Sequence, residues 1–537
     1  MPRVLLSLLP LLLASSPSLL HAQPADWLLR NAKILDGSGN PWFIGDIAIR
    51  GDTIVAVTPA SAGPNLASID ARRTLDLRGL AAAPGFVDTH SHSRRGIFDV
   101  PLAENCIRQG VTTVIEGPDG SSPLPVKPFL ARVAVLKPAI NFGMLAGHGT
   151  IRSDVMGSEN RKATADEIRK MRELTRQAMR DGAFGISTGL FYVPGNYAPT
   201  EEVIELGRAA AEFGGIHTSH MREEASGVLD SVRETIRIGE EGGLPTQITH
   251  HKIIGAPYWG RSVDTLRLVD EARARGVDVT IDQYPYTASS TGISALFPQW
   301  AQAGGGKALR ERLDAPETRA RIKAVIVDRI KNDRGAGDPK NVQIASCSFD
   351  KSAAGKTLAE LTARRGVPVT IENAAETAIE LQTKGGCQAI YHAINEEDVE
   401  RILRHPQTMV ASDGGIPIPG DGVPHPRNYG TFARVLSRYV RERSAITLEE
   451  AVRKMSSFPA ARFRIMDRGL LRPGMKADIA VFDPAKVRDK AEFGNPHQYA
   501  EGFAHVFVNG EAVLLEGKMT GARPGRVLYG PGTERIP

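Results

Sequence analysis

The chain has 537 residues, long enough for a barrel with accessory elements and too long for a single small binding module. Its 42% apolar and 24% charged residues exclude a mainly disordered or fibrous protein. The net charge is only +5, and the Lys and Arg residues form no basic block, so the charge indicates no nucleic-acid partner.

The first 22 residues have the pattern of a secretory signal peptide. A basic residue, Arg3, precedes an apolar run over residues 4–14, and the stretch ends at the small residue Ala22. The run contains Pro10 and is well short of the roughly 20 continuous apolar residues that a membrane-spanning helix needs. We therefore expect residues 1–22 to be removed. The mature protein should then be exported, periplasmic or secreted, and free of the membrane.

Both ends of the mature chain favour short β-strands. Alternating apolar residues separated by Gly and Asp turns occur within residues 26–57 and 478–517. The segment between these two stretches has a different pattern. Residues 23–83 and 469–537 are therefore expected to build one small β-sandwich domain together.

The middle of the chain alternates short apolar runs with helical stretches, which favours βα units and a parallel sheet. Eight runs are predicted as strands: 85–88, 112–115, 141–145, 184–187, 215–219, 246–249, 277–281 and 408–412. Capping boxes at Thr164 and Thr447 predict helix starts between or after them. Eight repeats predict an α/β fold with a (β/α)8 TIM-like barrel over residues 84–283 and 408–468. The stretch 284–407 is too long for a loop, so we expect an inserted subdomain between strands seven and eight.

The three cysteines, Cys106, Cys347 and Cys387, are odd in number and lack zinc-ribbon spacing, so no disulfide scaffold is expected. Cys106 falls in a helix-like stretch, and the chain has no Gly-x-Ser-x-Gly motif. Covalent catalysis by a cysteine or serine is therefore the weaker interpretation.

Histidines lie at the ends of several predicted strands. His90 and His92 are two residues apart, so both can address one metal ion from the barrel mouth. His220 and His250 follow neighbouring strands, and Asp413 follows the eighth. In such barrels the C-terminal strand ends form the active site, which brings these side chains together. The alternative, polar residues in solvated loops, explains one His-x-His pair better than it explains the whole set.

This constellation resembles the amidohydrolase superfamily, and the surrounding segments resemble its N-acyl-D-amino-acid deacylase (D-aminoacylase) branch. The segments that carry the resemblance are 185–190, 218–223, 249–252, 282–287, 412–414, 425–432, 508–510 and 524–528. The resemblance implies a metal-dependent enzyme that hydrolyses the amide bond of N-acyl-D-amino acids to a carboxylate and a free D-amino acid.

The resemblance also implies residue roles. His220 and His250 would hold the principal zinc ion, and His90 and His92 would form the second half of a site for one or two ions. Asp413 would take a proton from the attacking water and return it to the leaving amine. Zinc lowers the pKa of bound water to about 7, which makes a serine or cysteine nucleophile unnecessary.

One position departs from the branch, in which a cysteine usually follows the second strand and contributes a metal ligand. Asp119 occupies that place in this chain. A carboxylate is a harder ligand than a thiolate, so Mn²⁺ or another divalent ion becomes acceptable beside zinc. Glu116 is the alternative ligand, and Asp119 before Gly120 also fits a simple turn.

Recognition of a substrate carboxylate needs a cation near the metal. Lys252 lies two residues after a predicted metal ligand and would point to the same side of the chain. Tyr192, Tyr284 and Ser290 match positions that line the substrate pocket in the branch. Arg427 is a second candidate cation. The alternatives are a solvated loop charge for Lys252 and half-buried packing residues for the tyrosines.

Two other functions stay open at this point. The same scaffold can hydrolyse cyclic amides or β-aspartyl dipeptides, because a fold does not fix a substrate. A catalytically silent binding protein is the second alternative: the missing cysteine supports it, and the complete histidine set argues against it. Both enzyme interpretations expect a small-molecule substrate as the partner.

Overall fold

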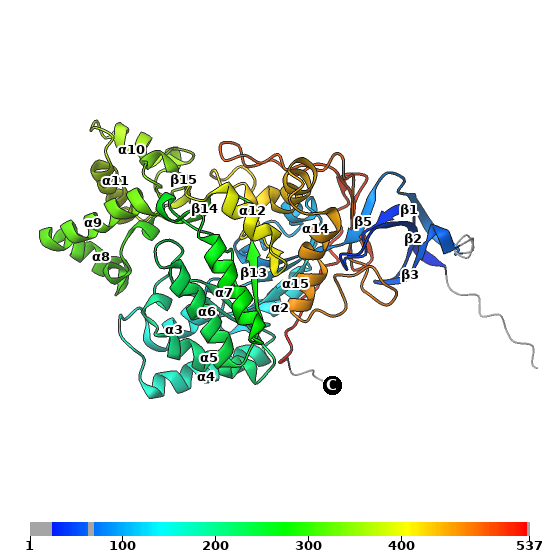
Figure 1. Cartoon of the computed structure of the whole chain (residues 1–537), viewed down its shortest axis with the longest axis horizontal. Helices are drawn as coiled ribbons and strands as arrows, with labels where there is room; N and C mark the ends of the chain where they lie inside the picture. The colour runs from blue at the N-terminus through cyan, green and yellow to red at the C-terminus, as the bar shows by residue number, and fades with distance from the viewer. Residues whose placement is uncertain (1–23, 63–68, 534–537) are drawn as a thin grey trace, which may run out of the picture.

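The computed structural model describes residues 24–62 and 69–533. The predicted signal peptide lies outside these residues. The described chain has three parts (Figure 1): a β-sheet domain at the right, strands surrounded by helices in the middle, and a mainly helical part at the upper left that contains α8 (Gly305–Asp314) and α11 (Ile371–Thr383).

Nine strands from the two ends of the chain form one sheet. The N-terminal segment supplies β1 (Ala25–Ile34), β2 (Phe43–Arg50), β3 (Thr53–Pro59), β4 (Ala71–Asp76) and β5 (Ala81–Pro84). The C-terminal segment supplies β18 (Ile479–Phe482), β19 (Phe503–Val508), β20 (Glu511–Leu515) and β21 (Lys518–Met519). The order is β21-β20-β19-β18-β5-β1-β2-β3, with β4 also paired to β1. The two segments join at the antiparallel pair β5–β18, where Ala83 lies opposite Ala480.

The barrel strands are buried along their whole length. They are β6 (Phe86–Ser91), β7 (Val111–Glu116), β8 (Asn141–Met144), β9 (Ala146–Gly147), β10 (Gly185–Gly189), β11 (Ile216–His220), β12 (Thr246–Ile248), β13 (Val279–Gln283) and β17 (Thr408–Val410). Complete burial is typical of parallel strands that are covered on both faces. All eight predicted strands are present, and β9 is a short additional strand that directly follows the predicted run 141–145.

Two parallel sheets make up the barrel. β6, β7 and β8 pair in one sheet, and β9 to β13 and β17 pair in the other. Only Leu145 separates β8 from β9. At the opposite edges, the Asp413 amide donates to His90 O (2.9 Å) and the His92 amide donates to Gly414 O (2.6 Å). The ends of β6 and β17, which carry predicted site residues, therefore lie side by side.

Helices alternate with the barrel strands and continue after the last one. They are α1 (Glu104–Ile107), α2 (Val126–Leu136), α3 (His148–Met156), α4 (Ala165–Arg180), α5 (Thr200–Ala211), α6 (Val228–Gly242), α7 (Ser262–Ala274), α12 (Glu396–Arg404), α13 (Arg427–Arg434), the π-helix Val435–Glu442, α14 (Leu448–Met455) and α15 (Ser457–Arg462). Thr164 caps α4 in the predicted capping box, and Thr447 caps α14 by accepting a hydrogen bond from the Glu450 amide (3.1 Å). None of the helices in residues 24–62 and 69–533 is long and apolar enough to span a membrane.

The stretch between β13 and β17 folds as an inserted part with its own core. It contains α8 and α11 together with β14 (Ser289–Gly292), α9 (Pro316–Asn332), β15 (Val342–Ser346), α10 (Leu358–Arg364) and β16 (Gln388–Tyr391). The strands form an antiparallel sheet in the order β14-β16-β15. Its buried apolar residues form a separate cluster, to which the barrel adds Phe191.

A disulfide bond joins Cys347 and Cys387 in the inserted part. Cys347 directly follows β15 and Cys387 directly precedes β16, its antiparallel neighbour, so the two Cα atoms are 4.4 Å apart. This single bond was not predicted from the sequence, because a separation of 40 residues gives no hint that two strands will place the thiols together. Cys106 is free and buried in α1.

Candidate metal centre and active-site cavity

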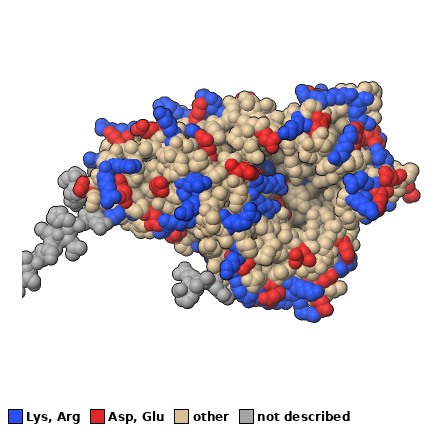
Figure 2. Space-filling model, turned by 180° about the vertical axis from the view of Figure 1, so that it is seen from behind, with Lys and Arg blue, Asp and Glu red and all other residues tan. Residues whose placement is uncertain are grey.

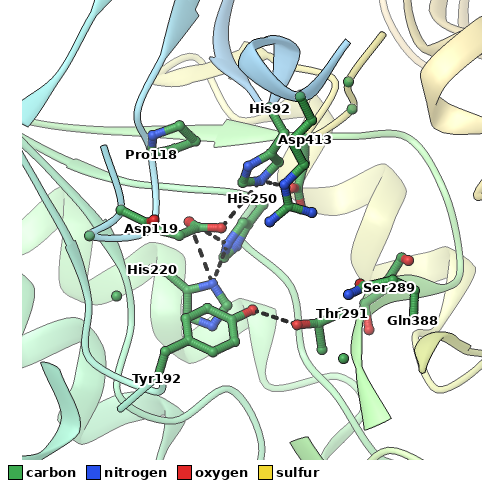
Figure 3. Close-up of a pocket in the computed structure, with 18 of the residues that line it drawn as sticks. His92, Pro118, Asp119, Tyr192, His220, His250, Ser289, Thr291, Gln388 and Asp413 are labelled. Carbon is green, nitrogen blue, oxygen red and sulfur yellow. Dashed lines mark hydrogen bonds and ion pairs between the residues drawn. The ribbon is translucent and has the colours of Figure 1, made fainter. Parts of the chain in front are cut away.

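Histidine and aspartate side chains from five strand ends converge at the C-terminal side of the barrel (Figure 3). Two groups are suited to a metal ion, and they share Asp119. The first group is His90, His92, Asp119 and Asp413, and the second is Asp119, His220 and His250. Within each group the ligand atoms lie within 4.8 Å of one another. The structure therefore brings together all six residues predicted as metal ligands or proton carrier.

Asp119 faces both groups with its two carboxylate oxygens. Its Oδ1 lies 3.3 Å from His90 Nε2, and its Oδ2 lies 3.4 Å from His92 Nε2. The same Oδ1 lies 3.6 Å from His220 Nδ1 and 3.4 Å from His250 Nε2. The Asp119 carboxylate is thus a candidate ligand common to both groups.

Glu116, the alternative ligand, has other partners. Its carboxylate accepts hydrogen bonds from the Arg94 amide (2.7 Å) and the Gly117 amide (2.8 Å). It is a member of neither group. Glu116 thereby orders the turn that carries Asp119, and the geometry favours Asp119 at the position where the branch has cysteine.

Asp413 lies between the two histidines of the first group and a cation, Arg427. Its Oδ1 is 3.1 Å from His92 Nε2 and 3.5 Å from His90 Nε2, and its Oδ2 is 2.9 Å from Arg427 NH1. Burial raises the pKa of Asp413, but the opposing effect of Arg427 and His90 is larger. The pKa of Asp413 is therefore held below its usual value. This carboxyl group is therefore ionised at neutral pH, as a general base must be.

Three site residues adopt a backbone conformation that side chains other than glycine rarely take. The φ angles are 56° at Asp119, 37° at His250 and 49° at Asp413. Such left-handed residues persist only where the surroundings fix them, and they concentrate at functional sites. Here each one follows the end of a barrel strand and turns its side chain toward the shared centre.

The donor set fits a divalent cation. Asp119 Oδ1 and His90 Nε2 are buried without a hydrogen-bond partner among the described residues, and His220 Nδ1 lies only 2.6 Å from His250 Nε2. Burial lowers the pKa of His92, but Asp119 and Asp413 raise it to about 9. Burial and Lys252 lower the pKa of His250, but Asp119 and Glu224 raise it to about 9. The positions of His92 and His250 therefore favour positive charge, which protons or a metal ion can supply.

Two buried aspartates hold the strand ends that carry these ligands. Asp282 accepts hydrogen bonds from the His250 amide (2.6 Å) and from Gln247 Nε2 (2.5 Å). Asp88 accepts from the Ser412 amide (2.9 Å) and hydroxyl, and burial raises its pKa to about 6. Each aspartate thus binds the backbone beside a ligand on a neighbouring strand.

Glu224 is a site residue that the sequence did not single out. It is 1% exposed, and its carboxylate lies 3.3 Å from His250 Nδ1 and 4.0 Å from His220 Nε2. These nitrogens are the ones that do not face Asp119. Lys252 Nζ donates to Glu224 Oε1 (2.5 Å) and lies 2.8 Å from His250 Nδ1. Lys252 is therefore on the predicted side of the chain, but its charge is paired with Glu224.

A cavity of about 990 Å³ opens onto the cluster. It is lined by all five residues predicted to bind substrate: Lys252, Tyr192, Tyr284, Ser290 and Arg427. The buried hydroxyl of Tyr284 has no hydrogen-bond partner in the described chain. The other two hydroxyl groups have partners: the Tyr192 hydroxyl bonds Thr291 Oγ1 (3.1 Å), and Ser290 Oγ donates to Ala389 O (3.0 Å). The inserted part supplies one wall through β14 and the start of β16.

Comparisons with known proteins agree with this site. A family model described as "Amidohydrolase family" matches residues 73–514. The chain belongs to the amidohydrolase family. Two relatives of this amidohydrolase come from Alcaligenes xylosoxydans xylosoxydans, and both are 37% identical to it. One is a D-aminoacylase, which aligns over 94% of this chain and 98% of its own length. The other is an N-acyl-D-glutamate deacylase, which aligns over 94% of this chain and 96% of its own length.

A solved structure of an N-acyl-D-glutamate deacylase from Bordetella bronchiseptica has a TM-score of 0.81 to this amidohydrolase, at 34% identity over 94% of this chain and 100% of that chain. That structure is complexed with zinc and with a phosphonate inhibitor that mimics the tetrahedral intermediate of the reaction. The complete ligand set and the family together identify a metal-dependent amidohydrolase, rather than a catalytically silent binding protein on the same scaffold.

Proposed function

We propose that this amidohydrolase hydrolyses N-acyl-D-amino acids to a carboxylate and a free D-amino acid. The observation that carries the proposal is the complete cluster of histidines and aspartates at the base of a cavity that also holds cations and a free tyrosine hydroxyl. Near full-length similarity to a D-aminoacylase and to N-acyl-D-glutamate and N-acyl-D-aspartate deacylases supports it.

The metal would be held by residues already in place. Asp119, His220 and His250 suit one ion, and His90, His92, Asp119 and Asp413 suit a second. Zinc is the ion held by the solved relative, and the carboxylate of Asp119 also suits a harder ion such as Mn²⁺. A divalent ion in this site would acidify the attacking water and polarise the amide carbonyl.

Asp413 would act as general base and then as general acid. Its ionised carboxylate takes a proton from the attacking water and returns it to the amide nitrogen, so that the amine leaves neutral. Arg427 holds Oδ2 at 2.9 Å, which leaves Oδ1 facing His92 and the reaction site. No serine or cysteine nucleophile is needed.

The α-carboxylate of the substrate would bind between Arg427 and Tyr284. The guanidinium of Arg427 lies 4.8 Å from the centre of the Tyr284 ring, and the Tyr284 hydroxyl has no partner among the described residues. Ser290 belongs to the same wall, since its carbonyl oxygen accepts from Arg427 NH2 (3.3 Å). Lys252 adds positive charge behind them while paired with Glu224.

The substitution Asp413→Asn tests this assignment. It removes the base but keeps the size of the side chain, so hydrolysis of N-acetyl-D-methionine should fall by roughly 10²–10⁴ in kcat. The matched control is Asp421→Asn, which makes the same change at an exposed carboxylate on the rim of the cavity. Equal rates for the Asp413→Asn variant and the wild type would remove Asp413 from the mechanism.

Substrate class is tested with four compounds. N-acetyl-D-methionine should be hydrolysed, whereas N-acetyl-L-methionine, a hydantoin and a β-aspartyl dipeptide should react at least tenfold more slowly. A preference for the hydantoin or the dipeptide would favour one of the alternative amidohydrolase activities instead.

We also propose that the protein is exported, to the periplasm or the medium. Residues 1–22 have the sequence pattern of a signal peptide. The Cys347–Cys387 disulfide supports the proposal, because structural disulfides persist mainly in oxidising compartments. Finding the protein in the cytoplasmic fraction, with residues 1–22 retained, would overturn it.

A further inference from the structure

Five cationic side chains line the active-site cavity: Arg94, Arg95, Lys252, Arg334 and Arg427. Figure 2 shows the face on which the surface is hollowed, with Lys and Arg side chains at the edge of the hollow. The proposed reaction needs a cation for only one substrate carboxylate. The contacts of each cation therefore show which of the five could bind a further anion.

Three of the five cations already have partners. Arg427, assigned above to the α-carboxylate, is also 2.9 Å from a carboxylate oxygen of Asp413. Lys252 is 2.5 Å from a carboxylate oxygen of Glu224. Arg94 NH1 donates to a backbone oxygen at 2.5 Å. Arg95 is exposed to solvent on the rim. Arg334 remains.

Arg334 is buried and has no hydrogen bond or ion pair with any residue that the structure describes. Its side chain is only 3% exposed, and its Nε is a buried donor without an acceptor. The guanidinium carbon lies 4.4 Å from the ring centre of Phe191 and 5.7 Å from that of Tyr391. A guanidinium has five donors, and leaving it buried without an acceptor is unfavourable. An anion in the cavity would satisfy it.

The backbone that carries Arg334 is fixed. It forms the turn after α9, in which the Gly335 amide donates to Arg329 O (3.2 Å) and the Gly337 amide to Ile330 O (3.1 Å). Asn341 Nδ2 closes the turn on Gly335 O (2.9 Å). The backbone from which the guanidinium extends is therefore fixed before any ligand arrives, and the rings of Phe191 and Tyr391 pack against the side chain. Both features reduce the entropy lost on binding.

Arg334 lies one aromatic side chain away from the metal centre. The ring of His220 is 4.6 Å from that of Tyr192 and 5.9 Å from that of Phe191, against which Arg334 packs. Two acidic groups, Asp333 and Glu224, interact electrostatically with Arg334 at longer range. Burial raises the pKa of Asp333 to about 6, and Glu224 is ion-paired with Lys252. Neither carboxylate forms a hydrogen bond or ion pair with Arg334 in the part of the chain that the structure describes.

We propose that Arg334 forms an anion subsite that binds a second carboxylate of the substrate, in addition to the α-carboxylate. The preferred substrates are then N-acyl-D-amino acids with an acidic group at one end, either on the amino-acid side chain or on the acyl chain. This inference rests on the proposed function and narrows it to a substrate class.

Paired substrates test the subsite. N-acetyl-D-glutamate is compared with N-acetyl-D-glutamine, and N-succinyl-D-alanine with N-butanoyl-D-alanine, for the wild type and for Arg334→Gln. In at least one pair, the wild type should prefer the acidic member. The variant should lose about 10- to 100-fold in kcat/KM for that member and less than threefold for its neutral counterpart, since hydrogen bonds to charged groups have this magnitude. The pair that responds shows which end of the substrate carries the anion.

Matched variants and a binding measurement complete the test. Arg95→Gln removes an exposed cation from the same cavity and should leave both substrate pairs within threefold, whereas Arg334→Lys should keep part of the preference. Binding of D-glutamate and D-glutamine to the metal-loaded protein gives a readout that needs no hydrolysis. If the side chain carries the anion, the wild type should bind D-glutamate more tightly and Arg334→Gln should bind both equally.

Two results would overturn the subsite. Equal losses for acidic and neutral substrates in Arg334→Gln would show that Arg334 binds the α-carboxylate common to both. Wild-type protein that hydrolyses neutral substrates and shows no preference for either acidic member would also refute it, with the proposed function intact. Failure to hydrolyse any N-acyl-D-amino acid would instead refute the proposed function itself.

Discussion

Glu224 lies on the side of the His220 and His250 rings that faces away from Asp119. The nitrogens of His220 and His250 that face Asp119 are Nδ1 and Nε2, and the carboxylate of Glu224 lies near the opposite nitrogen of each ring. A carboxylate in that position fixes the tautomer and orientation of a ligating histidine. One glutamate thus serves two histidines, and it also holds Lys252.

The substitution Glu224→Gln should therefore weaken metal binding by about 10- to 100-fold, the range seen when such outer carboxylates are removed. The loss should fall on one ion only, the one assigned to His220 and His250. Metal affinity measured by competition with a chelator gives the result.

The control is Glu223→Gln at the neighbouring glutamate, whose carboxylate accepts from the amides of Glu224 and Ala225 and faces neither histidine. The amide oxygen of glutamine keeps those bonds, so metal affinity should stay unchanged. If Glu224→Gln binds both ions as tightly as Glu223→Gln does, the positioning role is wrong.

At the metal centre, the sequence predicted the candidate ligands better than the residues that position them. His90, His92, His220, His250 and Asp413 were found because each stands at a strand end, a place defined by local patterns. Glu224 follows His220 by four residues, but nothing in the sequence shows that the loop after β11 turns it back toward both rings. Arg334 gave no signal, because its importance comes from packing between the insertion and the barrel.

The wall of the cavity depends on a short sheet and its disulfide. Ser346 and Gln388, which pair across β15 and β16, both line the cavity, and each is bonded in sequence to a disulfide cysteine. The bond closes a loop across 40 residues that includes α10 and α11. It therefore ties the cavity wall to the helices of the inserted part.

Replacing both cysteines with serine should lower the free energy of unfolding by about 2–4 kcal/mol, because the bond restricts the unfolded chain. Denaturant unfolding of the double variant and of the wild type measures the difference. Wild-type protein unfolded with a reductant should behave like the variant. An unchanged midpoint in both cases would show that the disulfide adds no stability.

Strand positions were predictable because each barrel strand is a short apolar run buried on both faces, bounded by turns. The inserted part was predicted only as a segment too long for a loop. Its strands pair across nearly 100 residues, as where Ser290 lies opposite Ile390, and sequence periodicity does not report such distant pairing.

For the whole molecule, pH should govern metal affinity. The pKa values of His92 and His250 are raised from 6.5 to about 9, so the metal-free folded protein holds protons there that the unfolded chain releases earlier. These protons stabilise the metal-free fold below pH 6.5, and the stabilisation is lost as pH rises through 9. A metal ion must displace them, so its affinity should rise between pH 6.5 and 9.

The expected slope is up to about tenfold in affinity per pH unit for each displaced proton, and the release of protons on metal binding should be measurable at pH 7. Calorimetric titration in buffers of different ionisation enthalpy gives the proton number. Metal affinity that is constant from pH 6.5 to 9 would show that these histidines do not bind the ion.

Removing the metal and adding it back tests directly whether the cluster of histidines and aspartates holds the catalytic ion. Purified protein is stripped with a chelator, its zinc and manganese contents are determined, and hydrolysis of N-acetyl-D-methionine is followed as either ion is added back. Activity should disappear with the metal and return with one or two ions per chain. Full activity in metal-free protein, or a chain that binds no divalent ion, would contradict this expectation.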